Sequence, residues 1–407
     1  MTRNAVALVS AILLVAACTT SNPATSGGAS AGAGGSQAAG GTIKIGGGFA
    51  LTGDESALDL PAANGAKLAV KQINAAGGVK GRPFELLFED EEANPPVAVR
   101  KAEKLLQQDK ADLLTGTVNS GSTLAVGQLA ERNDRILVTT VSYATSITGT
   151  QCSPNVFRVN ANAFQQSAAL TAWLTKNVPG KKYFFVGPDY EMGRSTITAF
   201  QNDIKRLGGA DVGSTFPPLG AKDFSTYLGP IRAAQPDVII TATAGNDTVR
   251  LLSQLKEYGM LNDKLTLAGA AGAVTQENIG AMGGAGEGFL SAAGYSADID
   301  TPANKAFVAA FKKEYQTEPD LFGADTYGLF FLFKKAIEKA GGTDTAKLRA
   351  AMEDMSWDTP QGVKTVRKGD HQAVVDMVIV KVVKNDFKTV GRVNGADAVG
   401  PDTCDRF

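Results

Sequence analysis

The sequence predicts an α/β protein built as two lobes, each with a parallel β-sheet covered by helices. The first observation is length, because 407 residues exceed the usual size of one domain and suit two. The second is that strand and helix patterns alternate from Thr42 onward, and such βαβ runs form parallel sheets. The third is that the alternation starts again near Tyr183, with no obvious linker rich in proline, glycine or serine between the two parts.

The first part of this body predicts a βαβαβα run. In the helix after the first strand, small and aliphatic residues recur every three or four positions, which is the spacing of one helical face. These residues are Ala62, Ala66, Ala69 and Ile73, and the glycines Gly77 and Gly78 follow them. The remaining elements expected in order are strands Thr42–Phe49 and Phe84–Glu89, a helix from near Pro96, strand Asp112–Thr115, the segment Ser122–Asn133 and strand Ile136–Thr140.

The second part repeats this plan. An apolar stripe along the predicted helix Asp247–Tyr258 consists of Val249, Leu252, Leu255 and Tyr258, and Gly259 ends that helix. The other expected helices are Met192–Leu207, Phe224–Ala234, Pro302–Tyr315 and Gly323–Ala340. The expected strands are Tyr183–Val186, Asp237–Thr241, Leu265–Leu267, Gly288–Ala292 and, in the tail, Val374–Lys384.

The composition favours binding over catalysis. The 40 Lys and Arg are balanced by 41 Asp and Glu, which argues against nucleic acid as a partner, since a phosphate backbone needs a basic excess. The single histidine, His371, leaves little room for histidine acid–base chemistry or for a metal site. Its surroundings, KGDH, predict a surface turn, and no G-x-S-x-G serine accompanies it. We therefore expect no enzymatic activity, no cofactor and no metal.

The N-terminus predicts export. Ala5–Ala17 is an uncharged apolar run of about 13 residues, too short to span a bilayer but suited to a secretory signal peptide covering residues 1–17. It ends in VAAC, which resembles a bacterial lipobox, so we expect Cys18 to become a lipidated N-terminus. Residues 18–41 would then form a flexible tether, since Ala24–Gly41 contains only Ala, Thr, Ser, Gly and Gln. Ordinary signal cleavage beside an incidental cysteine is the alternative.

Export also predicts a disulfide bond between Cys152 and Cys404. The two cysteines lie far apart without C-x-x-C spacing, so neither zinc nor a thioredoxin-type redox function is indicated. In an oxidising compartment, two remaining cysteines pair more often than not. The bond would tie the C-terminal tail to the body, and two unpaired thiols are the alternative.

An ordered set of short segments runs along the body. The segments are Ile43–Gly46, Leu51–Gly53, Gly65–Ala66, Ile73–Arg82, Asp189–Gly193, Lys222–Ser225 and Pro302–Phe307. Together they resemble the leucine/isoleucine/valine-binding family of periplasmic solute-binding proteins, which serve ABC importers. The resemblance covers the chain from Thr42 to the tail.

This resemblance implies the type I periplasmic binding protein fold, in which two Rossmann-like lobes with parallel sheets are joined by three hinge crossovers and close on a ligand. Lobe 1 would comprise residues 42–161 and 296–365, and lobe 2 residues 162–295 and 366–407. The implied function is that of a monomeric lipoprotein that delivers a small solute to ABC permease subunits. It would be anchored on the periplasmic or extracellular face of the cell membrane and would touch the membrane only through its lipid. A ligand sensor of the same fold that reports to a signalling partner is the alternative.

The resemblance further implies a carboxylate-binding turn in lobe 1. Ser120, Gly121 and Ser122 follow a strand and open a helix, where amides and small hydroxyls suit an anion. The family holds the ligand carboxylate at this turn, and Ser120 falls at its key serine. A plain helix cap is the alternative for these residues.

Two further loops carry candidate ligand contacts. In the loop after the strand Ile136–Thr140, Ser142, Tyr143 and Thr145 compete for the family's head-group positions. Tyr143 could equally be an aromatic residue of the core or the rim. In lobe 2, Tyr190 and Met192 lie where the family places an aromatic ring over the ligand, and either could instead pack against the start of the helix.

The clearest departure from the family concerns the ligand amine. The acidic residue that pairs the ligand ammonium falls here at Ala271, and two tyrosines of the site fall near Ala244 and at Leu58. A buried ammonium without a partner costs several kcal/mol. We therefore expect a carboxylate with an apolar or aromatic body, larger than the usual ligand, rather than a zwitterionic amino acid. Asp247 and Glu277 are nearby acids that could rescue an amine.

Overall fold

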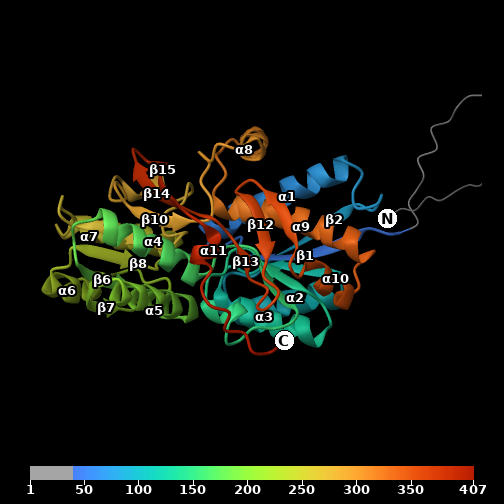
Figure 1. Cartoon of the computed structure of the whole chain (residues 1–407), viewed down its shortest axis with the longest axis horizontal. Coiled ribbons are helices and arrows are strands. Elements are labelled where there is room, and N and C mark those ends of the chain that lie inside the picture. Colours follow the sequence, from blue (N-terminus) through green and yellow to red (C-terminus); the bar gives the residue numbers. More distant parts are fainter. Residues whose placement is uncertain (1–39) are drawn as a thin grey trace, which may run out of the picture. The chain divides into compact units, whose positions relative to one another are not determined.

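The computed structural model describes residues 40–407, and the chain there alternates strands and helices around two large β-sheets (Figure 1). The predicted α/β class and the two lobes are confirmed. The predicted signal peptide and Cys18, together with the tether up to residue 39, lie outside the described residues. Between residues 40 and 407, no helix is both long enough and apolar enough to cross a membrane.

Lobe 1 is built on a five-stranded sheet in the order β2-β1-β3-β4-β5, with every pair parallel. The strand order reverses between β1 and β3, and open α/β sheets bind ligands beyond the carboxyl ends of the strands at such a point. The strands are β1 (Ile43–Phe49), β2 (Phe84–Asp90), β3 (Leu113–Gly116), β4 (Leu137–Thr139) and β5 (Val156–Arg158).

Helices cover both faces of the lobe 1 sheet, with α1 and α9 packed together on one side and α2 and α3 on the other (Figure 1). The first pair approaches closely, because a Cβ atom on Gly65 would lie 2.2 Å from the carbonyl oxygen of Gly323. The helices are α1 (Ser56–Ala75), α2 (Pro95–Gln107), α3 (Ser120–Arg132), the 3₁₀ turn η1 (Thr145–Thr148), α8 (Pro302–Tyr315), α9 (Leu321–Ala340) and α10 (Thr345–Met352). A small sheet beside α9 contains β11 (Ser356–Thr359), β12 (Gly362–Val366) and β13 (Ala373–Val374).

Lobe 2 is built on a seven-stranded sheet in the order β15-β14-β10-β9-β8-β6-β7. Its first strands are parallel, whereas β14 and β15 join antiparallel at one edge. One core cluster holds side chains of α4 and α5, and another holds side chains of α6 and α7. The strands are β6 (Lys182–Val186), β7 (Ala210–Thr215), β8 (Val238–Thr241), β9 (Thr266–Gly269), β10 (Leu290–Ala293), β14 (Met377–Val383) and β15 (Asp386–Val393). The helices are α4 (Ala163–Asn177), α5 (Glu191–Arg206), α6 (Ser225–Ala234), α7 (Gly245–Glu257), η2 (Ile279–Met282) and α11 (Gly395–Ala398).

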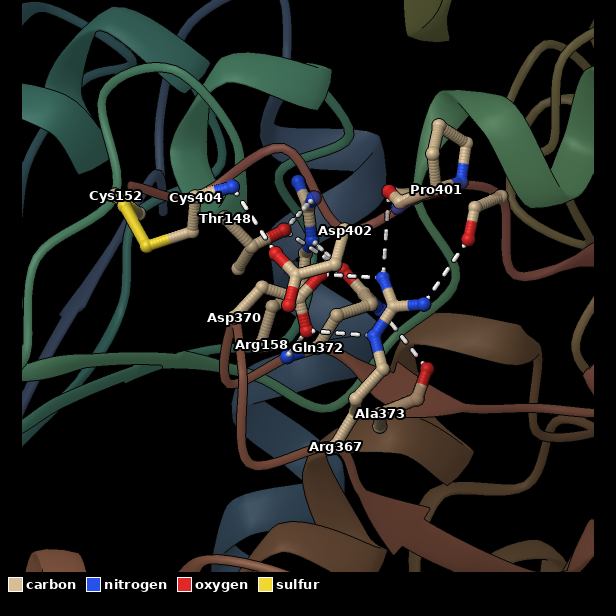
Figure 2. Close-up of polar contacts among 12 residues, drawn as sticks. Thr148, Cys152, Arg158, Arg367, Asp370, Gln372, Ala373, Pro401, Asp402 and Cys404 are labelled. Atoms are coloured by element: carbon tan, nitrogen blue, oxygen red, sulfur yellow. Dashed lines mark hydrogen bonds and ion pairs between the residues drawn. A yellow bond between two sulfur atoms is a disulfide. The ribbon is translucent and has the colours of Figure 1, made fainter. Parts of the chain in front are cut away.

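Three crossovers join the lobes, at residues 159–162, 294–301 and 375–376. The exact residue boundaries given above for the lobes stay a prediction. After β15, the chain returns to lobe 1, where Cys404 forms a disulfide bond with Cys152 (Figure 2). Arg406 of this tail pairs with Glu131 of α3 at 2.9 Å. The predicted pairing of the two cysteines is therefore confirmed.

The prediction for His371 is wrong, because its ring is buried instead of lying at the surface. The imidazole stacks on Phe157 with 3.8 Å between ring centroids, and the ring of Phe407, in the disulfide-tied tail, lies with its centroid 4.4 Å from that of the imidazole. Burial lowers the pKa of His371 to about 4. The histidine is thus a neutral packing residue of lobe 1.

Candidate ligand-binding site

A small cavity lies between the lobes, beyond the carboxyl ends of the sheet strands. Most of its lining is apolar, and its polar groups come from a carboxyl and two tyrosines. Lobe 1 contributes Glu55, Leu58, Val118, Val141, Tyr143 and Phe322. Lobe 2 contributes Tyr190, Met192, Ala242, Ala244, Ala270 and Ala271. This position and this lining make the interlobe cavity the candidate ligand site.

The cavity brings together four of the nine predicted ligand contacts. Tyr143, Tyr190, Met192 and Ala271 line it. The other five predicted residues, Ser120, Gly121, Ser122, Ser142 and Thr145, lie outside this lining. The role of all nine as ligand contacts stays a prediction.

Two of the predicted serines fix the shape of the cavity wall. The hydroxyl of Ser142 donates to the carbonyl oxygens of Thr117 at 2.7 Å and Val118 at 3.0 Å, so it ties the loop after β4 to the loop after β3. The hydroxyl of Ser120 accepts from the amide of Ala144 at 3.3 Å. Both hydroxyls are fully buried, and they hold the two wall loops in register.

The N-terminus of α3 is capped by Asn119, which sequence reasoning missed. Its side-chain oxygen accepts from the amides of Gly121 at 2.9 Å and Ser122 at 3.3 Å. Asparagine is a preferred residue at this position because it satisfies amides that have no partner inside the helix. The two amides expected to hold a ligand carboxylate are therefore hydrogen-bonded within the chain.

A buried arginine supports the head-group loop from behind (Figure 2). The guanidinium of Arg158 donates to the carbonyl oxygens of Ala144 at 2.6 Å and Ser142 at 3.4 Å, and also to the side chains of Thr148 and Gln372, both at 2.6 Å. Burial lowers the pKa of Arg158 to about 9, which leaves it cationic at neutral pH. The arrangement places a positive charge behind the loop that contains Tyr143.

The carboxyl in the cavity belongs to Glu55, a residue that the sequence analysis did not single out. Its Oε1 accepts from the hydroxyl of Tyr190 at 3.0 Å, and this hydrogen bond joins lobe 1 to lobe 2. Burial raises the pKa of Glu55 to about 7. A carboxylate accepts more than one hydrogen bond, so Glu55 can also receive a donor group of a ligand. The only signal in the sequence was an acidic residue between the glycine turn and the start of α1.

Glu55 changes what Ala271 implies for a ligand amine. Ala271 lines the cavity from lobe 2 without a charge, and Glu55 supplies a carboxyl from lobe 1 in the same cavity. The two acids considered as substitutes, Asp247 and Glu277, both lie outside the lining of the cavity. The carboxylate of Asp247 instead accepts from the amide of Gly220 and pairs with Arg250.

Two more carboxyl groups are buried near Glu55. Asp59 accepts from the amide of Ala50 at 2.7 Å, and Glu91 accepts from the amide of Val118 at 3.2 Å. Burial raises the pKa of Glu91 to about 8 and raises that of Asp59, to which repulsion by Glu91 also contributes. A cluster of three carboxyls this close together favours protonated forms.

Polar contacts join the lobes at the edge of the cavity. Asp54 of lobe 1 forms ion pairs with Lys222 at 3.3 Å and Arg250 at 3.4 Å, both from lobe 2. The hydroxyl of Ser146 donates to Glu191 at 2.7 Å. These contacts form only when the lobes are together, so the structure shows the closed arrangement.

The sequence family agrees with this architecture. Residues 42–387 match the family model described as periplasmic binding protein. The chain belongs to the periplasmic binding protein family. Such proteins bind small ligands, and the relatives of this chain are binding proteins rather than enzymes.

Curated relatives of this binding protein are named for amino acids. The Leu/Ile/Val-binding protein homolog 3 of Brucella melitensis is 28% identical over 306 residues, which cover 75% of this chain and 81% of the relative. The leucine-, isoleucine-, valine-, threonine- and alanine-binding protein of Pseudomonas aeruginosa is 26% identical over 298 residues, covering 73% and 78%.

Solved structures include neighbours with a different kind of ligand. A solute-binding protein of an ABC transporter from Rhodopseudomonas palustris, in complex with 3,4-dihydroxybenzoic acid, has a TM-score of 0.81 and 26% identity, covering 88% of this chain and 98% of the neighbour. A leucine-binding protein from Thermotoga maritima has a TM-score of 0.80 and 25% identity, covering 88% and 100%.

Proposed function

We propose that the chain is the extracytoplasmic substrate-binding lipoprotein of an ABC importer of the branched-chain amino acid type. It captures a small amino acid or aromatic carboxylate in the interlobe cavity. The observation that carries this proposal is the cavity lined by both lobes beyond the ends of their strands. The names of the relatives support both ligand classes, because they include leucine-binding proteins and a complex with a dihydroxybenzoic acid.

The lining suits an amphipathic solute. Leu58, Met192 and Phe322 offer an apolar wall for an aliphatic or aromatic body. The hydroxyl of Tyr143, on the loop backed by Arg158, offers a donor for a carboxylate. At the other polar end, Glu55 accepts from an ammonium or from a phenolic hydroxyl.

The mechanism is hinge closure. A ligand first held by one lobe gains contacts with the other lobe on closure, and this difference in affinity shifts the population toward the closed state. The hydrogen bond between Glu55 and Tyr190 and the ion pairs of Asp54 form in the same step. The closed protein then presents both lobes to the permease.

Calorimetry with matched ligand pairs tests the proposal. One pair is phenylalanine and 3-phenylpropanoate, another is leucine and 4-methylpentanoate, and benzoate with 4-hydroxybenzoate forms the third. At least one compound should bind one-to-one with a dissociation constant in the micromolar range or below. If the amino acid of a pair binds more tightly, Glu55→Gln should remove that preference, because it removes the negative charge opposite the ammonium.

A blocking variant locates the binding. Ala244→Trp places an indole in the cavity and should abolish binding of the tightest compound. Ala210→Trp adds the same ring at an exposed position of β7 and should leave the affinity unchanged. Failure of every compound to bind at millimolar concentration, or unchanged binding in Ala244→Trp, would overturn the proposal.

A further inference from the structure

A second and larger pocket lies on the other side of the loop after β9. Its free volume is about 200 Å³, which is larger than that of the interlobe cavity. Lobe 1 borders it with Glu318–Leu321, the crossover borders it with Tyr295–Asp298, and lobe 2 borders it with strands β10, β14 and β15. Ala271 is the one residue that lines both this crossover pocket and the interlobe cavity.

Four buried polar atoms of residues that line the crossover pocket have no hydrogen-bond partner among residues 40–407. They are the hydroxyls of Ser291, Tyr295 and Ser296 and the Oδ2 atom of Asp320. The four residues are between 3% and 6% exposed. Leaving a buried polar group unpaired destabilises a protein, so a cluster of four at one pocket indicates a group that pairs with them.

The carboxylate of Asp320 is held in a fixed orientation. Its Oδ1 caps α9 by accepting from the amides of Phe322 and Gly323, both at 2.9 Å. Oδ1 accepts both hydrogen bonds of the cap, whereas Oδ2 is buried without a partner among the described residues, in a side chain that lines the pocket. The side chain therefore serves the helix with one oxygen and has the other available for a ligand.

The lining of the crossover pocket contains more acidic than basic side chains, which favours a cationic ligand. Four acids, Asp298, Glu318, Asp320 and Asp386, line the pocket with one base, Lys388, which pairs with Asp386 at 2.7 Å. Glu318 pairs with Lys312 at 2.7 Å, and Asp298 accepts from the amide and hydroxyl of Thr389 at 3.0 and 2.6 Å. Asp320 thus has no cationic side chain paired with it in the part of the chain that the structure describes.

The lining favours an organic cation over a metal ion. Within the described range, no group of three or more histidine, cysteine, aspartate or glutamate side chains is arranged to hold a metal. Leu321, Val380 and Phe387 give the pocket an apolar wall beside Asp320. We propose that the crossover pocket is a second binding site, for a small organic ammonium ion whose nitrogen contacts Asp320 and the hydroxyls of Ser291 and Tyr295.

Calorimetry with 3-methylbutylammonium, and with the neutral 3-methylbutan-1-ol as its matched compound, tests this second site. The amine should bind one-to-one and at least tenfold more tightly than the alcohol. Asp320→Asn keeps an oxygen that caps α9 but removes the charge, and it should weaken amine binding at least tenfold. The matched control is Asp344→Asn, which changes the N-cap of α10 outside the pocket and should change binding less than twofold.

Two outcomes separate this site from the interlobe cavity. Ala244→Trp should leave amine binding intact while it abolishes binding of the ligand of the interlobe cavity, so the two proposals fail independently. Tyr295→Phe, which removes one hydroxyl without changing the ring, should weaken amine binding several-fold. No amine binding at 10 mM, equal binding of the alcohol, or unchanged binding in folded Asp320→Asn would overturn the second site.

Discussion

The buried carboxyl of Glu91 predicts that lobe 1 becomes less stable as the pH rises through neutrality. Its side chain is 0% exposed, and burial raises its pKa from 4.5 to about 8. Between these two values, the folded protein keeps a proton that the unfolded chain releases. The unfolded state therefore binds fewer protons, and the free energy of unfolding falls as the pH rises, by about 1.4 kcal/mol per pH unit for one group.

The perturbation is Glu91→Gln, which resembles the protonated side chain and cannot ionise. Two pH units at about 1.4 kcal/mol each give about 2.8 kcal/mol. As the pH rises from about 5.5 to about 7.5, the free energy of unfolding should fall in both proteins. The fall should be smaller in the variant than in the wild type by this amount. The other buried carboxyls, Glu55 and Asp320 among them, keep part of the slope, since burial raises the pKa of each to about 7.

Urea unfolding followed by tryptophan fluorescence measures this slope within one lobe. The chain has two tryptophans, Trp173 on α4 of lobe 2 and Trp357 on β11 beside α9 of lobe 1. In a Trp173→Phe background, the signal of Trp357 reports lobe 1. Glu85→Gln, an exposed glutamate on β2, is the control and should keep the wild-type slope. A wild type that gains stability over this pH range, or a Glu91→Gln variant with the wild-type slope, would refute the reasoning.

Two further predictions concern the contacts between distant parts of the chain. Cys404→Ser should lower the free energy of unfolding by about 2–4 kcal/mol, because the bond to Cys152 closes a loop with a sequence separation of 252; urea unfolding with and without a reductant measures it, and equal stability of the oxidised and reduced wild type would contradict it. Asp54→Asn should weaken ligand binding by no more than about thirtyfold through faster dissociation, since its two pairs, with Lys222 and Arg250, are partly exposed and such pairs contribute about 0–1 kcal/mol each. Stopped-flow kinetics measure the change, and a hundredfold loss would show that the rim, rather than the cavity, supplies the affinity.

The sequence predicted the features that local patterns determine. The alternation of strand and helix signals gave the α/β class, and the two cysteines outside the predicted signal region gave the disulfide. Short elements were missed, because β5 contains only Val156–Arg158, too few residues to show a period. The helix α4 was missed as well, although Asn162 and Gln165 form a capping box at its start.

The candidate site was predicted less well, because it depends on how segments from both lobes meet. Ala271 lines the interlobe cavity, yet no periodicity indicates that Glu55 enters the same cavity from lobe 1. The polar turn around His371 looked exposed, but the tail tied by Cys404 brings Phe407 over it. In each case, a contact distant in sequence decided the environment of the residue.

The structure of the protein with its tightest-binding compound tests the central claim most directly. Crystals grown with that compound should show it in the interlobe cavity, in contact with Glu55 of lobe 1 and Tyr190 of lobe 2 in the same molecule. The lobes should be held together by the pairs of Asp54. A compound bound only outside this cavity, or touching one lobe alone in a closed molecule, would contradict the account.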